Sequence, residues 1–155
     1  MKADVINSFI KASMDVIQQT TGVQPKLGKA YRKTTPYKSN SMVVLIGLTG
    51  DLQGNVAITM DLNLACNIAS MMMGGVEVTT LDEMAKSAVA ELGNMILGNT
   101  GILLAQIGIR IDVTPPTILT GEKMELSNQN ALIIGVPLLF DGDQLFELNI
   151  SYRVK

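Results

Sequence analysis

The sequence predicts an α+β domain: a largely antiparallel sheet built from two hairpins and covered by helices, including one long central helix. Two observations point to this class. Two pairs of apolar, strand-like segments are each joined by a short polar turn, which is typical of antiparallel hairpins. Helical patterns precede the first pair and separate it from the second, and such a mixture of helices and hairpin-linked strands indicates an α+β fold. The 155 residues suggest a single domain over residues 1–155.

The chain opens with a helical pattern followed by a basic segment. Over residues 2–20, apolar positions recur on one helical face, and Gly22 and Pro25 close the segment. No acid occurs between Asp15 and Asp51, so residues 26–40 are polar and basic. They fit either a solvated edge strand and loop or a docking surface for an acidic partner. The basic residues are Lys26, Lys29, Arg32, Lys33 and Lys38.

The first hairpin joins SMVVLIGLTG (41–50) through DLQ to GNVAITMD (54–61). Its first strand is almost wholly apolar, which predicts a buried, central place in the sheet. A helix follows over residues 62–75 and ends at two glycines. Met71–Met73 could suggest a soft-metal site, but methionines in such a helix more often fill core gaps. Cys66 is expected to be a small buried side chain, because no histidine is present to activate it.

A long helix is predicted from about Thr80 to Ile107, with Thr80 and Glu83 as a capping box. The segment IRIDVTPPTILTG follows, and its two prolines predict an edge strand or a kinked crossing. ALIIGVPLLF and QLFELNISYRV, joined by DGD, form the second hairpin. Each half of the chain contains one hairpin, but the two halves share no sequence identity. The sequence therefore does not decide whether the fold contains an internal structural repeat.

The composition excludes several classes of function. The chain has no histidine, which rules out histidine acid–base chemistry and histidine metal ligands, and one cysteine fits a reducing compartment. A net charge of -2 argues against a nucleic-acid partner. The N-terminus lacks the apolar core of a signal peptide, and no run of about 18 apolar residues predicts a membrane span. We therefore expect a cytoplasmic protein without membrane insertion.

The long helix carries a polar face inside the stretch SAVAELGNMILGN (87–99). At 100° per residue, Ser87, Glu91, Asn94 and Gly98 fall within roughly 60° of arc. The expected core sector lies elsewhere and comprises Leu81, Ala85, Ala88, Leu92, Met95, Ile96 and Leu103. Glu91 and Asn94, at i and i+3, would thus stand on a flat surface between two small residues. A solvated helix side of no function would also carry polar residues.

Chemistry limits what this pair can do. The Asn94 carboxamide can orient a water but cannot act as a general base, whereas Glu91 can pair with a cation. No base accompanies Ser87, and neither a phosphate-binding glycine loop nor a metal-ligand cluster is present. Catalysis by this face would therefore need groups from a second molecule. The same spacing recurs as Glu125 and Asn128 in a polar stretch without an apolar helical flank, and we interpret that copy as a chance match.

Three blocks carry a resemblance to a known family: MMMGG, LDEMAKSAVAELGNMILGN and DVTPPTILTG. In this order and spacing, they resemble the CheX chemotaxis phosphatases, within the wider CheC/CheX/FliY group. The shared pattern, a Ser or Asp followed by a glutamate four residues on and an asparagine three residues later, matches Ser87, Glu91 and Asn94. The resemblance covers most of the chain. Glu125 and Asn128 do not form a second credible motif, which fits CheX better than CheC.

The resemblance implies hydrolysis of the aspartyl phosphate on a phosphorylated CheY-like response regulator. Glu91 and Asn94 would be catalytic: Glu91 would pair with a regulator lysine and Asn94 would hold the attacking water in line. Ser87 and Gly98 would line the binding surface. The chain would hold no metal or cofactor of its own, and Mg²⁺ would belong to the regulator. A homodimer with joined sheets is also implied. The alternative is a non-catalytic module of the same fold that binds response regulators or belongs to the flagellar switch.

Overall fold

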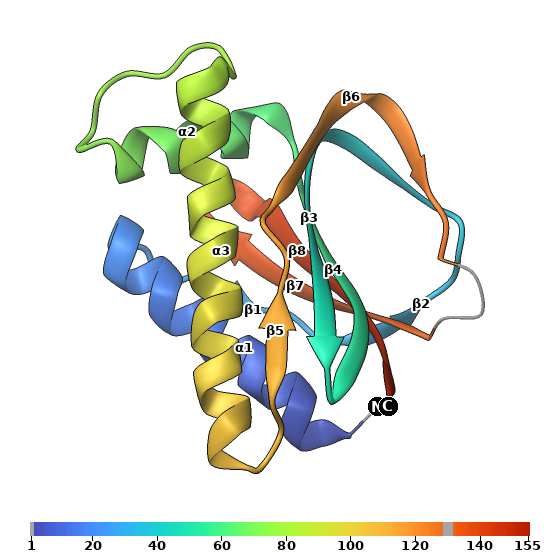
Figure 1. Ribbon diagram of the computed structural model, residues 1–155. Coiled ribbons are helices and arrows are strands. Elements are labelled where there is room, and N and C mark those ends of the chain that lie inside the picture. Colours follow the sequence, from blue (N-terminus) through green and yellow to red (C-terminus); the bar gives the residue numbers. More distant parts are fainter. Residues whose placement is uncertain (1, 129–131) are drawn as a thin grey trace.

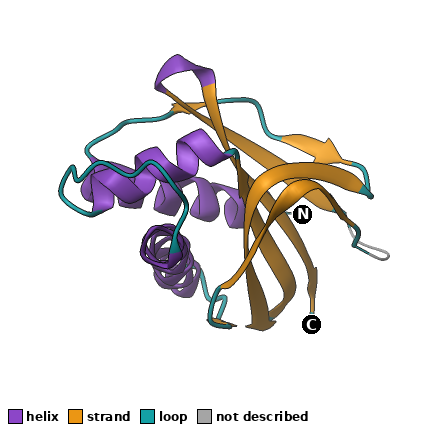
Figure 2. Cartoon of the chain, turned by 90° about the horizontal axis from the view of Figure 1, so that it is seen from above, coloured by secondary structure: helices purple, strands orange, loops and turns teal. Residues whose placement is uncertain are grey.

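The computed structural model describes residues 2–128 and 132–155, which form one curled sheet with three α-helices on one of its faces (Figures 1 and 2). Ala131 of the second predicted hairpin lies outside the described residues. In chain order the elements are α1 (Ala3–Thr21), β1 (Lys26–Leu27), β2 (Tyr31–Lys33), β3 (Tyr37–Gly50), β4 (Leu52–Met60), α2 (Leu62–Met72), α3 (Glu83–Gln106), β5 (Ile111–Val113), β6 (Thr117–Leu126), β7 (Ile133–Phe140), a 3-10 turn (Asp141–Asp143) and β8 (Gln144–Val154).

The two predicted hairpins form the centre of the sheet. The strand order is β1-β7-β8-β4-β3-β5, with β2 also pairing with β7 and β6 with β3. Every pairing between described strands is antiparallel, and β8 joins the β7–β8 hairpin to the β3–β4 hairpin by pairing with β4. The predicted fold class is therefore confirmed. β3 is internal, as its apolar sequence predicted, with β4 on one side and β5 and β6 on the other.

The proline segment is a kinked crossing. Pro115 and Pro116 lie between the short strand β5 and the longer strand β6, and both strands pair with β3. Prolines donate no backbone hydrogen bond, so the ladder is interrupted where they stand. Among the described residues β6 pairs with β3 alone, and it therefore presents its other edge, ten residues long, at the rim of the sheet.

The basic segment is not a uniformly solvated edge, and that expectation is wrong at Lys33. β1 and β2 do form short edge strands on β7, with Lys26 exposed. The Lys33 ammonium, however, lies 2.5 Å from a Glu147 carboxylate oxygen and donates to Asn149 Oδ1 at 2.9 Å. The Tyr31 hydroxyl donates to the other Glu147 oxygen at 2.8 Å. Glu147 and Asn149 belong to β8, more than 100 residues from Lys33 in the sequence, so no local pattern around Lys33 predicted this ion pair.

The core fills the space between the sheet and the helices. Alternate residues of β3, β4, β7 and β8 point toward the helices, and residues such as Val44, Ile58 and Leu148 are almost fully buried there. Cys66 of α2 is buried, and Met71 and Met72 pack against the core, as predicted; Met73, also expected to fill the core, is half-buried and does not join it. The long apolar helix α3 contacts α1, α2 and β3, so the sheet and two helices fix its orientation.

By length and composition α3 is apolar enough to span a bilayer, with a mean hydropathy of 1.3 over its most apolar window. In the described fold, 44% of that window is buried within the protein. Core helices of globular proteins pass the same test, so this helix alone is weak evidence for a membrane span.

Candidate functional site

Helix α3 begins at Glu83, and Asp82 is its N-cap. The Asp82 carboxylate accepts a hydrogen bond from the Ala85 amide at 2.9 Å, and the Asp82 backbone is extended. The predicted capping box of Thr80 and Glu83 is therefore wrong. Aspartate caps a helix at least as well as threonine, and the chain here has three candidates in a short run. The helix consequently starts later than predicted and presents Ser87 in its second turn.

One side of α3 lies close against the sheet at Gly93. A β-carbon placed there would stand 3.2 Å from Val44 Cγ1 and 3.3 Å from Ile58 Cδ1, so the glycine lets the helix approach the sheet closely. The buried residues of the helix surround this contact: Ala85, Val89, Ala90, Leu92, Gly93, Ile96, Leu97, Thr100 and Leu104. Met95 was predicted to face the core and is instead 37% exposed. Residues two positions apart lie on nearly opposite sides of a helix. Because Gly93 faces the sheet, Met95 faces solvent.

The opposite side of α3 carries the predicted polar face. Ser87, Glu91, Asn94 and Gly98 are all exposed. Side chains three and four residues apart on a helix are neighbours, with β-carbons about 5–6 Å apart, so Glu91 and Asn94 form one pair. A β-carbon at Gly98 would meet no atom within 4 Å, which leaves open space next to Asn94. Glu91 forms no ion pair with any described residue, and its carboxylate is free to meet an incoming cation.

Sequence reasoning missed the apolar residues that border this face. Met84 is 71% exposed and Ile102 is 60% exposed, at the two ends of the helix. With Met95 they follow the polar pair along the same side of α3, because all stand in register with Glu91 at steps of three or four residues. That spacing is visible in the sequence. Of these three residues only Met95 was predicted to face the core, because apolar residues on a helix usually are buried.

The second glutamate–asparagine pair is not on a helix. Glu125 belongs to β6, whereas Asn128 follows the strand. The Asn128 amide donates to Thr35 Oγ1 at 2.9 Å, and its side chain donates to Asn55 Oδ1 at 3.4 Å. Asn128 is thus engaged in structure, in agreement with the interpretation of this copy as a chance match.

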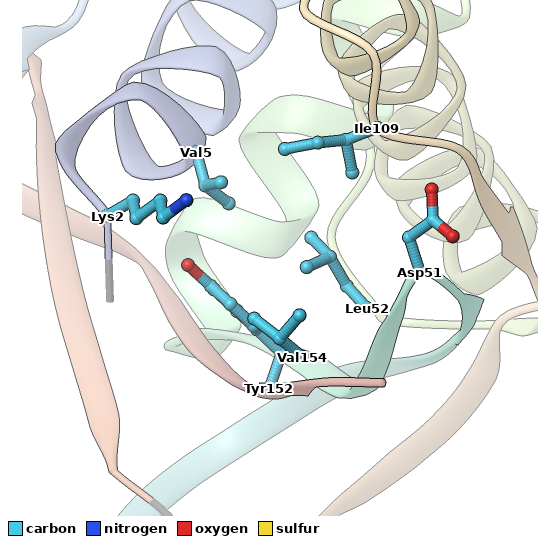
Figure 3. A pocket seen from close by; sticks show the side chains of 7 residues that line it. All are labelled: Lys2, Val5, Asp51, Leu52, Ile109, Tyr152 and Val154. Carbon is cyan, nitrogen blue, oxygen red and sulfur yellow. The ribbon is translucent and has the colours of Figure 1, made fainter.

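Other reactive groups of the described residues do not assemble a catalytic site. Burial raises the pKa of the Cys66 thiol, with the Asp82 charge adding to the effect, so the thiol stays protonated. In residues 2–128 and 132–155 no three His, Cys, Asp or Glu side chains gather as a metal site would require. A hollow of about 500 Å³ lies beyond the C-terminal end of α3, walled mainly by Val5, Leu52 and Tyr152 (Figure 3). It is chiefly apolar and separate from the polar face.

Comparison with known proteins identifies the relatives of this arrangement. The family model "Chemotaxis phosphatase CheX" matches residues 42–137, which include the whole of α3. This chain belongs to the CheX family. The CheY-P phosphatase CheX of Thermotoga maritima is 32% identical over 153 residues, covering 99% of this chain and 98% of the relative. The predicted resemblance is thereby confirmed, and so is the expectation that the chain is a phosphatase.

Solved structures of CheX-like proteins have the same fold. A CheC-like superfamily protein from Shewanella sp. PV-4 superposes with a TM-score of 0.89 at 24% identity, covering 99% of each chain. The CheX of a CheX–CheY–BeF3–Mg complex from Borrelia burgdorferi superposes with a TM-score of 0.85 at 29% identity, covering 98% of this chain and 99% of that one. The fold found here is thus that of CheX-like proteins from end to end.

Proposed function

We propose that this CheX-family protein hydrolyses the aspartyl phosphate of a CheY-like response regulator, with Asn94 orienting the attacking water and Glu91 pairing with a lysine of the regulator. The observation that carries the proposal is the exposed pair of Glu91 and Asn94 beside the open space at Gly98. Two polar groups on a convex helix surface enclose no substrate by themselves. They suit a reaction in which the second molecule brings the phosphoryl group.

The proposed chemistry is a single displacement at phosphorus. The water oxygen attacks, the bond between phosphorus and the aspartyl oxygen breaks, and the products are inorganic phosphate and the free carboxylate. An acyl phosphate is already reactive, so holding one water in line supplies much of what catalysis needs. A carboxamide can accept one hydrogen bond from that water and donate another to the phosphoryl group. Placement of a water by a neutral amide is the role given to the switch glutamine of GTPases.

The partner is expected to bring the metal. The Borrelia burgdorferi relative was solved together with CheY, BeF3 and Mg, which supports a CheY-type partner carrying Mg²⁺. The carboxylates nearest to Glu91 on α3 are engaged otherwise: Asp82 caps the helix, and Glu83 pairs with Lys86 at 3.2 Å. The residues of this face do not fit a magnesium site of their own. Ser87 and Gly98 would form part of the contact surface, and their small size allows the regulator to come close.

Phosphate release from a phosphorylated CheY-type regulator tests the proposal. The wild-type chain at substoichiometric concentration should accelerate release, whereas a non-catalytic regulator-binding module would bind without acceleration. Asn94→Ala should lose most of the acceleration while the Kd for the regulator changes little, because the interaction matters mainly in the transition state. Glu91→Ala should weaken both binding and rate by about tenfold or more, the usual worth of a charge-assisted hydrogen bond.

Asn94→Asp is the sharper variant. It keeps the size of the side chain but sets a second carboxylate beside an anionic phosphoryl group, so it should be at least as damaging as alanine. Asn7→Asp, the same change at an exposed position of α1, is the matched control and should keep full activity. Full activity of Asn94→Asp would overturn the water-positioning role and favour general-base chemistry instead.

We also infer that the chain forms a homodimer through strand edges. The exposed outer edge of β6 supports this inference, because a long unpaired edge is a ready template for pairing with another strand. An isologous contact between two β6 strands would join the sheets of two copies. It would leave the polar face of α3 available on each copy. A cytoplasmic location stays a prediction.

A further inference from the structure

We propose that a hollow at the N-terminal end of α3 is a docking socket for a lysine or arginine side chain of the regulator. The inference rests on the proposed function, because it assigns to the same partner a second point of contact. The hollow measures about 380 Å³ and lies between the α2–α3 loop and the first turn of α3, at the upper end of the helix in Figure 1. Its walls include Met73, Val76, Glu77, Val78, Asp82 and Met84.

The walls of this socket expose apolar surface that the fold does not use. Met84 is the most exposed large apolar side chain among the described residues, at 71%, and Val76 is 60% exposed. Two such side chains facing one hollow are unusual on a monomer surface, where exposed apolar residues are normally scattered singly. Met73 and Val78 are only partly buried and extend the apolar wall inward. An apolar group of a partner would remove all four from water.

The charge of the socket selects the kind of side chain. Glu77 and Asp82 supply carboxylates, and no lining residue is cationic. One Asp82 oxygen is used by the helix cap, while Glu77 forms no ion pair with any described residue. Apolar walls with acidic groups match the methylene stem and charged head of lysine or arginine, which bury the stem while the head keeps polar contacts.

The socket is continuous with the proposed catalytic face. Met84 and Glu91 are seven residues apart on one helix, which places them about 10 Å apart along its axis. A single receiver domain can therefore reach the socket and the Glu91–Asn94 pair together. A second copy of this chain fits less well. An isologous contact over this surface would bring Glu77, Glu83 and Glu91 of two copies together, and like charges across an interface are strongly unfavourable.

Binding and turnover separate recognition at the socket from chemistry at Asn94. Glu77→Gln should raise both the Kd and the KM about tenfold and make the Kd less sensitive to salt, with kcat unchanged. Val76→Thr and Met84→Gln keep the side-chain size and should raise the same two constants about threefold to tenfold. The Kd is measured by calorimetry with a CheY-type regulator in its BeF3-activated form, which is not turned over.

Two matched controls accompany these variants. Asp141→Asn makes the same change in net charge at an exposed residue of the 3-10 turn between β7 and β8, and Val154→Thr makes the same isosteric change at a valine that is 69% exposed at the end of β8. Both should leave the Kd and the KM unchanged. Circular dichroism and sizing test whether each variant keeps the fold and the oligomeric state of the wild type.

The outcomes distinguish the socket from the proposed function. Unchanged Kd and KM in Glu77→Gln and Met84→Gln would overturn the socket even if the wild type is an active phosphatase. A lower kcat at an unchanged Kd would also overturn it, because the residues would then act on chemistry. A change in sizing on Met84→Gln would assign the hollow to a contact between copies instead. If the wild type binds a regulator without accelerating phosphate release, the proposed function fails and the Kd comparison still decides the socket.

Discussion

The two glycines on α3 should respond to the same substitution in opposite ways. Gly93 lies over the sheet, where three side chains of β3 and β4 come within 3.5 Å of a β-carbon built on it. A leucine there adds three more carbons in the direction of Val44 and Ile58. Gly98 faces open space, and a leucine there meets no atom within 4 Å of its β-carbon. We expect Gly93→Leu to cost stability and Gly98→Leu to cost activity.

The magnitudes follow from two opposing terms. Replacing glycine by leucine within a helix gains about 0.8 kcal/mol in intrinsic propensity at either position. Overpacking a closely packed core costs about 1–3 kcal/mol, occasionally more, and it applies at Gly93 alone. Gly93→Leu should therefore lower the free energy of unfolding by about 2 kcal/mol when the cost is at its upper end. Gly98→Leu should raise it by up to about 1 kcal/mol.

Urea unfolding followed by circular dichroism measures the stability of both variants, and phosphate release measures their activity. Gly98→Leu should be fully folded and inactive, because its side chain would occupy the space beside Asn94 that the proposed docking of the regulator requires. Gly93→Leu should keep activity in proportion to its folded fraction. The reverse pattern, with a stable Gly93→Leu and an unfolded Gly98→Leu, would mean that α3 is rotated on the sheet. In that case the exposed face described here would be wrong.

Two further predictions concern the sheet. Leu119 of β6 is 41% exposed, and Leu119→Lys would place a charge at the proposed dimer edge. This variant should be a monomer of 16.6 kDa, whereas the wild type should be a dimer of about 33 kDa, twice that mass, in sizing with light scattering. A wild-type monomer at micromolar concentration would contradict the strand-edge dimer. The second prediction is a loss of stability at high pH, because burial raises the pKa of Tyr31 to about 12, with the hydrogen bond to Glu147 adding to it, and burial raises that of Tyr37 to about 12. Below the ordinary phenol pKa of 10.0 both the folded and the unfolded chain keep these protons, so the free energy of unfolding should fall as the pH rises from about 10 to about 12. Near-ultraviolet absorbance of the phenolates follows the titration, and ordinary midpoints in the folded protein would contradict the burial of both phenols and the added effect of Glu147.

Much of the fold was predictable because its signals are local. Apolar runs on both sides of short polar turns predict the two hairpins, and the proline pair predicts the break between β5 and β6. The Lys33–Glu147 pair was not predictable in this way. It depends on the pairing of β2 with β7, across which the Lys33 side chain reaches Glu147 of β8, and a lysine in a basic stretch otherwise indicates a solvated surface. The exact start of α3 was missed for a smaller reason, since Asp82 and Thr80 are both good caps.

The candidate site likewise has some features that follow from local sequence and others that depend on tertiary structure. Glu91 and Asn94 could be found from the sequence because they interrupt an apolar helix, and one helix fixes their spacing whatever surrounds it. The rotation of that helix on the sheet is a tertiary property. It is set where Gly93 meets Val44 and Ile58, and no periodicity along α3 alone distinguishes Met95 facing the core from Met95 facing solvent. The socket at Met84 depends further on how the α2–α3 loop folds back to the helix. If both proposals hold, the residues that act on the phosphoryl group are fixed by one helix, while those that choose the regulator lie partly in a loop. Loops tolerate substitution better than buried helices, so such an enzyme can change its regulator without changing its chemistry.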